Sequence, residues 1–207
     1  MRSIAHDPLN LYLYNTPDDY KYRARWQVGR KVKLFVQYCH AVYSGTAWTV
    51  NHGDSIMLLA DPTLEERPLN KILSRFVTWI VRLINWYCLS AEQQKRTAEL
   101  ISGMQNTFEA FLGESMSHIL EIDHLATAPE CQHRGYATAL VQLAAALADA
   151  RGVQLELTSS HPANRHFYQS LGFKFLHTFY VGAENTSWAG APVSIDLMVR
   201  DPKDIST

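Results

Sequence analysis

One short segment in the second half of the chain combines residues that suit anion binding. It follows a predicted strand, opens a predicted helix, and reads Gln132-His133-Arg134-Gly135-Tyr136-Ala137-Thr138. Glycine permits a tight turn, and the first N–H groups of a helix point outward without intrahelical partners. Arg134 and His133 add flanking donors. Such a turn can bind a pyrophosphate, although the same pattern also occurs in helix caps that only pack closely.

A second segment with spaced functional residues follows the next predicted strand. It begins at Pro162 and contains Asn164, Tyr168 and the pair Gly172-Phe173, separated by three residues each time. The residues from Asn164 to Ser170 read as a helix. A glycine just after the last helical residue ends the helix.

In type, order and spacing the two segments resemble the GNAT superfamily of N-acetyltransferases. That family carries R/Q-x-x-G-x-G/A at the CoA pyrophosphate, and N-x-x-x-Y-x-x-x-G-F after the following strand. The resemblance is strongest over residues 119–175. More loosely it covers the whole chain, which is similar in layout to the puromycin-acetyltransferase-like and fungal small-molecule branch, including its early Asp7-Pro8.

The resemblance implies that acetyl-CoA is bound between the fourth and fifth strands of the family fold. The pantetheine arm would lie along the backbone of Leu125 and Thr127, and a backbone N–H at or next to Leu125, where the strand bulges, would stabilise the oxyanion. The cofactor-binding residues implied are Leu125, Ala126, Thr127, Gln132, His133, Arg134, Gly135, Tyr136, Ala137, Thr138, Asn164 and Tyr168.

Three side chains are implied in catalysis. Tyr168 matches the family tyrosine that protonates the departing thiolate; otherwise it packs in the core beside Phe167. Glu121 and Asp123 are candidates for the base that deprotonates the amine. Strand alternation places Glu121, Asp123 and Leu125 on one face, opposite Ile122, His124 and Ala126. The branch often has an aromatic at position 121, so the base stays open, and Glu121 could instead pair with a buried arginine such as Arg75 or Arg82.

Other chemistries are disfavoured by spacing. The histidines from His118 onward form no H-x-x-x-H or H-E-x-x-H pattern, so we expect no metal site. Cys131 could carry an acyl group, but it lies at the phosphate end of the expected cofactor site rather than near the thioester.

Composition limits the class of partner. The chain has 207 residues and a formal net charge of -1, so we expect one domain over residues 1–207 and neither nucleic acid nor a membrane as partner. Three cysteines form no disulfide framework. The first ten residues, MRSIAHDPLN, lack the apolar run of a secretory signal, so we expect a cytoplasmic protein.

The elements that position these residues predict an α/β (α+β) fold with a mixed, mostly antiparallel sheet of six to seven strands flanked by helices, and the resemblance adds that strands four and five splay apart. A helix capped at Thr16 should run toward Tyr38. The remaining predictions are a hairpin over 46–50 and 55–59, helices over 68–89 and 90–112, a strand over 119–127, a helix over 134–150, a strand over 153–158, a helix over 164–170, and strands over 173–181 and 194–200.

The apolar stretch over residues 72–89 has two arginines near its middle, which argue against a transmembrane span. We expect a largely buried helix with a narrow wet edge; membrane contact or an apolar substrate wall around Phe76, Trp79, Ile80 and Trp86 is the alternative.

Taken together, the residues and the resemblance predict direct transfer of an acetyl group from acetyl-CoA to a primary amine of a small molecule in a ternary complex. One alternative is an acyltransferase of the same fold that uses a longer acyl-CoA or another acceptor. Another is a CoA-binding sensor or scaffold without turnover. The acceptor would be selected upstream of the fourth strand, where no transferable motif is found.

Overall fold

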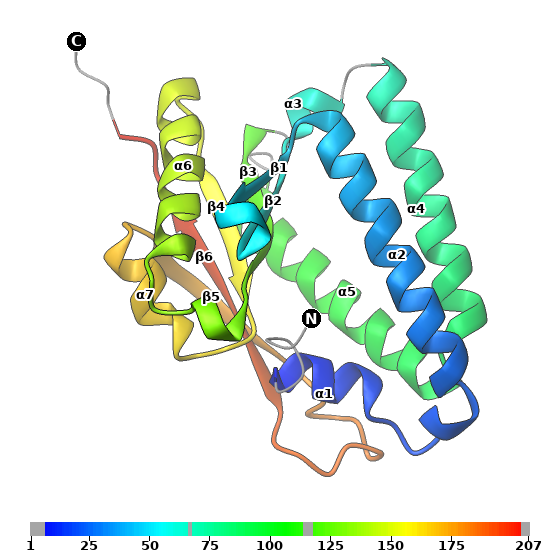
Figure 1. Cartoon of the computed structure of the whole chain (residues 1–207). Helices are drawn as coiled ribbons and strands as arrows, with labels where there is room; N and C mark the ends of the chain where they lie inside the picture. Colours follow the sequence, from blue (N-terminus) through cyan, green and yellow to red (C-terminus); the bar gives the residue numbers. More distant parts are fainter. Residues whose placement is uncertain (1–6, 66–67, 114–117, 204–207) are drawn as a thin grey trace.

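The computed structural model describes residues 7–65, 68–113 and 118–203, and a six-stranded sheet forms its centre (Figure 1). The first six residues, on which part of the secretory-signal expectation depends, lie outside the described range. The strands are β1 (Ala47–Val50), β2 (Ser55–Ala60), β3 (Leu120–Thr127), β4 (Leu155–Ser159), β5 (Lys174–Val181) and β6 (Val193–Arg200). Their order is β1-β2-β3-β4-β6-β5, and only β3 and β4 pair in parallel. The mixed, mostly antiparallel sheet is confirmed.

Helices cover both faces of this sheet. They are α1 (Pro8–Tyr14), α2 (Arg23–Ser44), α3 (Pro62–Glu65), α4 (Pro68–Cys88), α5 (Ala91–Phe111), α6 (Tyr136–Arg151) and α7 (Asn164–Ser170). The face with α6 holds the larger core, where Leu140 and Val141 pack against Leu120, Leu155 and Leu157 of the strands. On the other face α1 and α5 pack against β5 and β6, while α2 and α4 lie side by side at the outside (Figure 1).

Local sequence signals determine several of these elements. The hairpin forms as predicted, with β1 and β2 pairing from Ala47↔Leu58 to Val50↔Ser55. The helix α5 begins with the predicted capping box, in which Ser90 Oγ accepts from the Gln93 N–H at 3.1 Å and Gln93 Oε1 accepts from the Ser90 N–H at 3.1 Å. Both features depend only on residues close in sequence, so short-range reasoning finds them.

The predicted start of the first long helix is wrong. Its regular part, α2, begins at Arg23, after a short 3-10 turn over Asp19–Lys21. Thr16, the predicted cap, does not cap α2, because its hydroxyl donates to Asp18 Oδ1 at 2.8 Å and lies 3.4 Å from Ser90 Oγ. The Asp18 carboxylate in turn accepts from Ser90 Oγ at 2.6 Å, at the start of α5. The helix α1, which was not predicted, is capped by Asp7, whose Oδ1 accepts from the Asn10 N–H at 3.0 Å.

The expectation of a largely buried helix over residues 72–89 is also wrong. Only Cys88 is buried among the residues of α4. Trp79 is 58 % exposed and Trp86 is 70 % exposed. The helix touches the rest of the chain mainly along α2, where a side chain on Gly29 would place its Cβ 2.6 Å from Cys88 Sγ. The apolar residues of α4 do lie along one side of the helix, but no other described element covers that side.

Candidate active site

The parallel pair β3 and β4 is joined only at one end. The described ladder consists of Leu120↔Leu155 and Glu121↔Glu156, although β3 continues to Thr127. Along that continuation β3 stays paired with β2, up to Ser55↔Thr127. Backbone groups of residues 122–127 that face away from β2 therefore have no ladder partner on β4 within the described residues. An unpaired strand edge of this kind suits an extended, amide-bearing ligand.

A β-bulge interrupts β3 at Asp123. Leu58 pairs with His124 and Leu59 pairs with Ile122, so Asp123 is the extra residue between them. The bulge reverses the alternation, and Leu125 packs against the α6 core together with Ile122. The predicted grouping of Glu121, Asp123 and Leu125 on one face is therefore wrong beyond the bulge. His124 faces the opposite side, where its ring lies edge-on to Tyr38 with centroids 6.3 Å apart.

The turn before α6 is open at its helix end. Gly135 is the N-cap residue, with φ 80° and ψ 2°, and no side chain caps the helix. His133 also has a positive φ of 61°. A Cβ added at Gly135 would meet no atom within 4 Å. The start of α6 thus has no side-chain cap and no atom crowding Gly135, which suits an anion.

The side chains around this turn extend into solvent. Gln132, His133 and Arg134 are exposed, and Arg134 Nη2 donates to the Glu130 carbonyl at 3.2 Å. Tyr136, Ala137 and Thr138 are partly buried in the first turn of α6. Backbone N–H groups at the centre of the turn and the exposed Arg134 at its rim suit an anionic ligand.

Tyr168 lies on α7, at the C-terminal side of β4. It is 8 % exposed and its ring packs edge-on against Phe167 and Phe173, with centroids 5.0 and 5.8 Å away. Burial raises the pKa of its phenol to about 12, so the group keeps its proton at neutral pH. Tyr168 therefore packs in the core and also keeps a protonated hydroxyl group. Asn164, at the start of the same helix, is exposed.

A buried acid that the sequence analysis did not single out lies beside the two predicted carboxylates. Glu156 on β4 is 2 % exposed, and its Oε2 has no hydrogen-bond partner among the described residues. Burial, followed by the nearby charges of Glu121 and Asp123, raises the pKa of Glu156 to about 9. At neutral pH this carboxyl group is therefore protonated. A single acid inside the apolar run 155–157 was the available sequence signal.

Two cavities meet at Asp123 on the side of the sheet that faces α2. Cavity 1 has a volume of about 200 Å³ and cavity 2 of about 220 Å³. Both are lined by Gln37, Leu58 and Asp123, which therefore lie at their junction. Cavity 2 adds Asn10, Tyr14, Trp26, Arg30, Lys33, Leu34, Tyr38 and His124. Burial lowers the pKa of Lys33, which Asp123 partly opposes.

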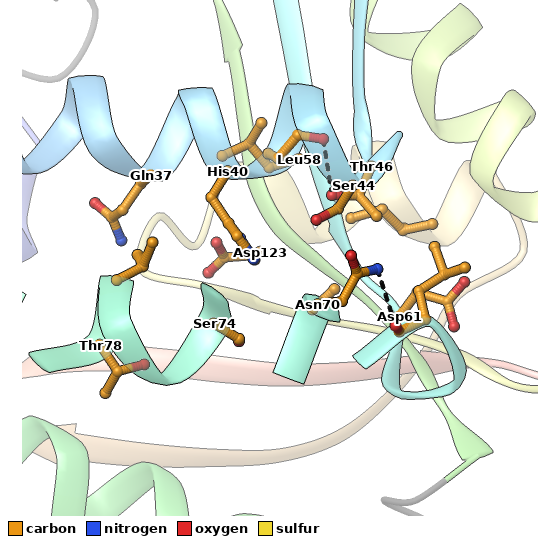
Figure 2. Close-up of a pocket in the computed structure, with 15 residues that line it drawn as sticks. Gln37, His40, Ser44, Thr46, Leu58, Asp61, Asn70, Ser74, Thr78 and Asp123 are labelled. Atoms are coloured by element: carbon orange, nitrogen blue, oxygen red, sulfur yellow. Dashed lines mark hydrogen bonds between the residues drawn. The ribbon is translucent and has the colours of Figure 1, made fainter. Parts of the chain in front are cut away.

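Cavity 1 lies between the inner sides of α2 and α4, and Figure 2 shows His40 and Asp123 pointing into it. Its other lining residues are Ala41, Ser44, Thr46, Leu59, Ala60, Asp61, Leu64, Asn70, Ser74, Val77 and Thr78. Two buried polar atoms in this lining, His40 Nε2 and Ser44 Oγ, have no hydrogen-bond partner among the described residues. Buried polar atoms without partners cost free energy, so they favour a polar ligand here.

Several sequence alternatives can now be compared with the structure. The alternative role of Glu121 required a buried arginine as its partner. Arg75 and Arg82 are instead exposed on α4. Phe76, Trp79, Ile80 and Trp86 are absent from the described lining of both cavities, so they form no substrate wall there. Cys131 is buried, and burial and its hydrogen bond to Asp54 raise the pKa of its thiol, which makes it a poor nucleophile.

Comparison with known proteins agrees with this architecture. Residues 85–175 match the model of the acetyltransferase (GNAT) domain. The chain is 24% identical over 198 residues to an uncharacterised N-acetyltransferase of Schizosaccharomyces pombe, covering 95% of this chain and 74% of the relative.

Two solved structures share the fold. The arylalkylamine N-acetyltransferase 2 of Aedes aegypti covers 97% of this chain and 89% of its own length, with a TM-score of 0.57 and 15% identity. The polyamine N-acetyltransferase of Drosophila melanogaster covers 78% of this chain and 77% of its own, with a TM-score of 0.52 and 12% identity. The family match over residues 85–175 and the S. pombe relative indicate the GNAT superfamily and support an acyltransferase of the N-acetyltransferase class.

Proposed function

We propose that this protein transfers an acetyl group from acetyl-CoA directly to a primary amine of a small molecule, within one domain formed by residues 1–207. The observation that carries the proposal is the position of Asp123. It lies at the β3 bulge, next to the end of the β3–β4 ladder and at the junction of two cavities. A donor at the strand gap and an acceptor in the cavities would meet there.

Acetyl-CoA would bind along two features of the fold. The uncapped N–H groups at the start of α6 would hold its pyrophosphate, flanked by Gln132, His133 and Arg134. The free edge of β3 over residues 125–127 would hold the pantetheine arm by backbone hydrogen bonds. When bound, acetyl-CoA supplies an activated acyl group as a thioester.

The side chains around the gap would then move the protons. Asp123 or Glu121 accepts a proton from the ammonium group of the acceptor, so that the free amine can form the new C–N bond. A backbone N–H at the bulge stabilises the oxyanion. As the C–S bond breaks, Tyr168 donates its proton to the departing thiolate. Its pKa of about 12 means that the phenol is protonated when the reaction begins.

Charge favours cavity 1 as the acceptor site. Its described lining residues include two acids, Asp61 and Asp123, and neither lysine nor arginine; Asp61 pairs with Arg151 at 2.5 Å, so Asp123 is the acid available to a cation. Cavity 2 contains Arg30 and Lys33, which would repel an ammonium group. The structural neighbours named for polyamine and arylalkylamine substrates support an amine acceptor of this kind. We infer that the acceptor is a small cation whose remaining polar groups bind His40 and Ser44.

Calorimetric titration with acetyl-CoA tests the donor site, using Gly135→Trp and Gly152→Trp as a matched pair. Both glycines have positive φ, 80° and 64°, and open space around them, but they lie at opposite ends of α6. Both variants suffer the same backbone strain, and only Gly135→Trp fills the phosphate turn. We expect roughly micromolar binding for the native chain and Gly152→Trp, and its loss in Gly135→Trp. Equal binding by both variants would contradict the assigned site.

A further inference from the structure

The outward sides of α2 and α4 carry two exposed apolar stripes. On α4 the members recur at alternating steps of three and four residues: Leu69, Ile72, Phe76, Trp79, Leu83 and Trp86. On α2 the same steps give Val28, Val32, Phe35, Cys39 and Val42. Because this spacing keeps side chains on one side of a helix, each helix presents a continuous stripe rather than scattered apolar residues.

The two stripes belong to one face of the molecule, which we call the α2–α4 face. The helices pack against each other along their lengths (Figure 1). At one end the exposed Arg25 places its guanidinium 5.0 Å from the ring centre of the exposed Tyr87. Arg25 precedes Val28 by three residues and Tyr87 follows Leu83 by four, so each lies on its own stripe. This contact joins the stripes at the surface.

Charge on these two helices is of one sign. The α2 sequence contains five basic residues, the α4 sequence contains three, and neither contains Asp or Glu. Arg30 and Lys33 turn inward to cavity 2. The exposed ones are Arg23, Arg25, Lys31, Lys71, Arg75 and Arg82. Of these, Arg23 pairs with Asp19 at 3.0 Å. The net charge of -1 for the whole chain therefore conceals a local concentration of positive charge.

This charge decides between two occupants. Steps of three and four also suit a partner helix, and a second copy could supply one. A two-fold dimer, however, would bring the same basic face against itself without acidic partners. An anionic bilayer surface suits both the apolar stripes and the positive charge. Tryptophan and phenylalanine insert at the headgroup boundary, while lysine and arginine reach the phosphates.

We propose that the α2–α4 face docks this protein on the surface of an anionic lipid bilayer. The contact would be peripheral, because none of the helices in the described ranges is long and apolar enough to cross a membrane. The inner sides of the same two helices line cavity 1, so docking would bring the acceptor side of the site close to the bilayer. The proposal does not depend on turnover and is tested without it.

Vesicle co-sedimentation is the direct test. We expect the protein to sediment with vesicles of phosphatidylcholine containing about 30 mol% phosphatidylserine, to remain free with phosphatidylcholine alone, and to be released as salt rises. Two double variants test the apolar and the charged parts of the contact separately. They are Trp79→Ser with Trp86→Ser, and Arg75→Glu with Arg82→Glu. Each pair should lower the partition coefficient by about tenfold or more.

Tyr180→Ser is the matched control, since Tyr180 is 61 % exposed on β5, away from this face, and its removal should leave partitioning unchanged. Equal sedimentation with both lipid compositions, or an equal loss in the control, would overturn the proposal. So would a native dimer in analytical ultracentrifugation that the tryptophan variant converts to a monomer, because the face would then belong to a second copy. All variants are exposed-site changes, and circular dichroism checks that they fold.

Discussion

Two polar regions of this molecule differ in how completely their groups are paired. Around Arg96 on α5, which is fully buried, the guanidinium donates to the carbonyls of Tyr12, Asn15 and Ser187 and pairs with Glu92 at 2.9 Å. Around Asp123, by contrast, Glu156 Oε2, His40 Nε2 and Ser44 Oγ have no partner among the described residues. The first region holds α1, α5 and the loop before β6 together. The second leaves buried polar groups unpaired, and we propose that they serve a substrate.

The comparison predicts that the Arg96 region governs stability. Arg96→Met should lower the free energy of unfolding by about 3–5 kcal/mol, because it removes the donor to the carbonyls of Tyr12, Asn15 and Ser187 and the ion pair with Glu92. Urea denaturation measures the loss. Lys95→Met, on the exposed side of the same helix, should change stability by less than about 0.5 kcal/mol. If Arg96→Met changed the free energy of unfolding as little as Lys95→Met, the Arg96 region would not govern stability.

Tyr168 should affect turnover and leave the fold intact. Tyr168→Phe removes only a hydroxyl with no recorded partner among the described residues, so the packing against Phe167 and Phe173 persists. If this hydroxyl protonates the leaving thiolate, kcat should fall by about a hundredfold while the KM for acetyl-CoA stays nearly constant. Steady-state thiol release measures both constants. An unchanged kcat would show that the residue only packs.

Glu156 should destabilise the folded chain as pH rises. Its pKa is about 9 in the folded chain against 4.5 for the free side chain, so between these values unfolding releases a proton. The free energy of unfolding therefore falls through that window, and Glu156→Gln should remove this part of the decline. Unfolding curves from pH 5 to 9 should show an advantage of the variant that grows with pH. Parallel curves would contradict the buried, protonated state.

His40 should contribute modestly to acceptor binding. His40→Ala removes a buried ring nitrogen without a partner, so stability should hold or rise slightly. The KM for the acceptor should increase by about two- to tenfold, as expected for one hydrogen bond, with acetyl-CoA binding unchanged. His166→Ala, at an exposed position of α7, is the control. Equal effects in both variants would mean that cavity 1 does not bind the acceptor.

Sequence reasoning found what neighbouring residues determine. The hairpin, the capping box at Ser90 and the turn at Gly135 depend on contacts within a few positions. The resemblance implied a bulge at or next to Leu125, but alternation alone could not place it at Asp123, because a period of two contains no sign of one extra residue. The same limit explains α4, since an apolar stripe does not reveal whether another element covers it. Thr16 shows the third case, in which the predicted cap hydroxyl contacts Asp18 and Ser90 instead of a helix N–H.

The residues of the candidate site divide in the same way. The turn at Gly135 and the helix position of Tyr168 could be predicted because motif spacing preserves their place in the fold, and the roles of both stay predictions. The group around Asp123 could not, because His40, Ser44 and Glu156 come from α2 and β4 and meet only after the sheet has formed. Only the isolated acid in the run 155–157 signalled a buried polar site in advance.

The central claim is that Asp123 lies where an amine attacks the thioester, and thiol release from acetyl-CoA with a panel of small amines tests it most directly. The account predicts amine-dependent thiol release and an acetylated amine by mass spectrometry. In Asp123→Asn the rate should fall by about 10²–10⁴-fold at nearly unchanged stability, because Asp123 is exposed and its side chain makes no hydrogen bond or ion pair among the described residues. Amine-dependent release that continues at the native rate in this variant would contradict the account.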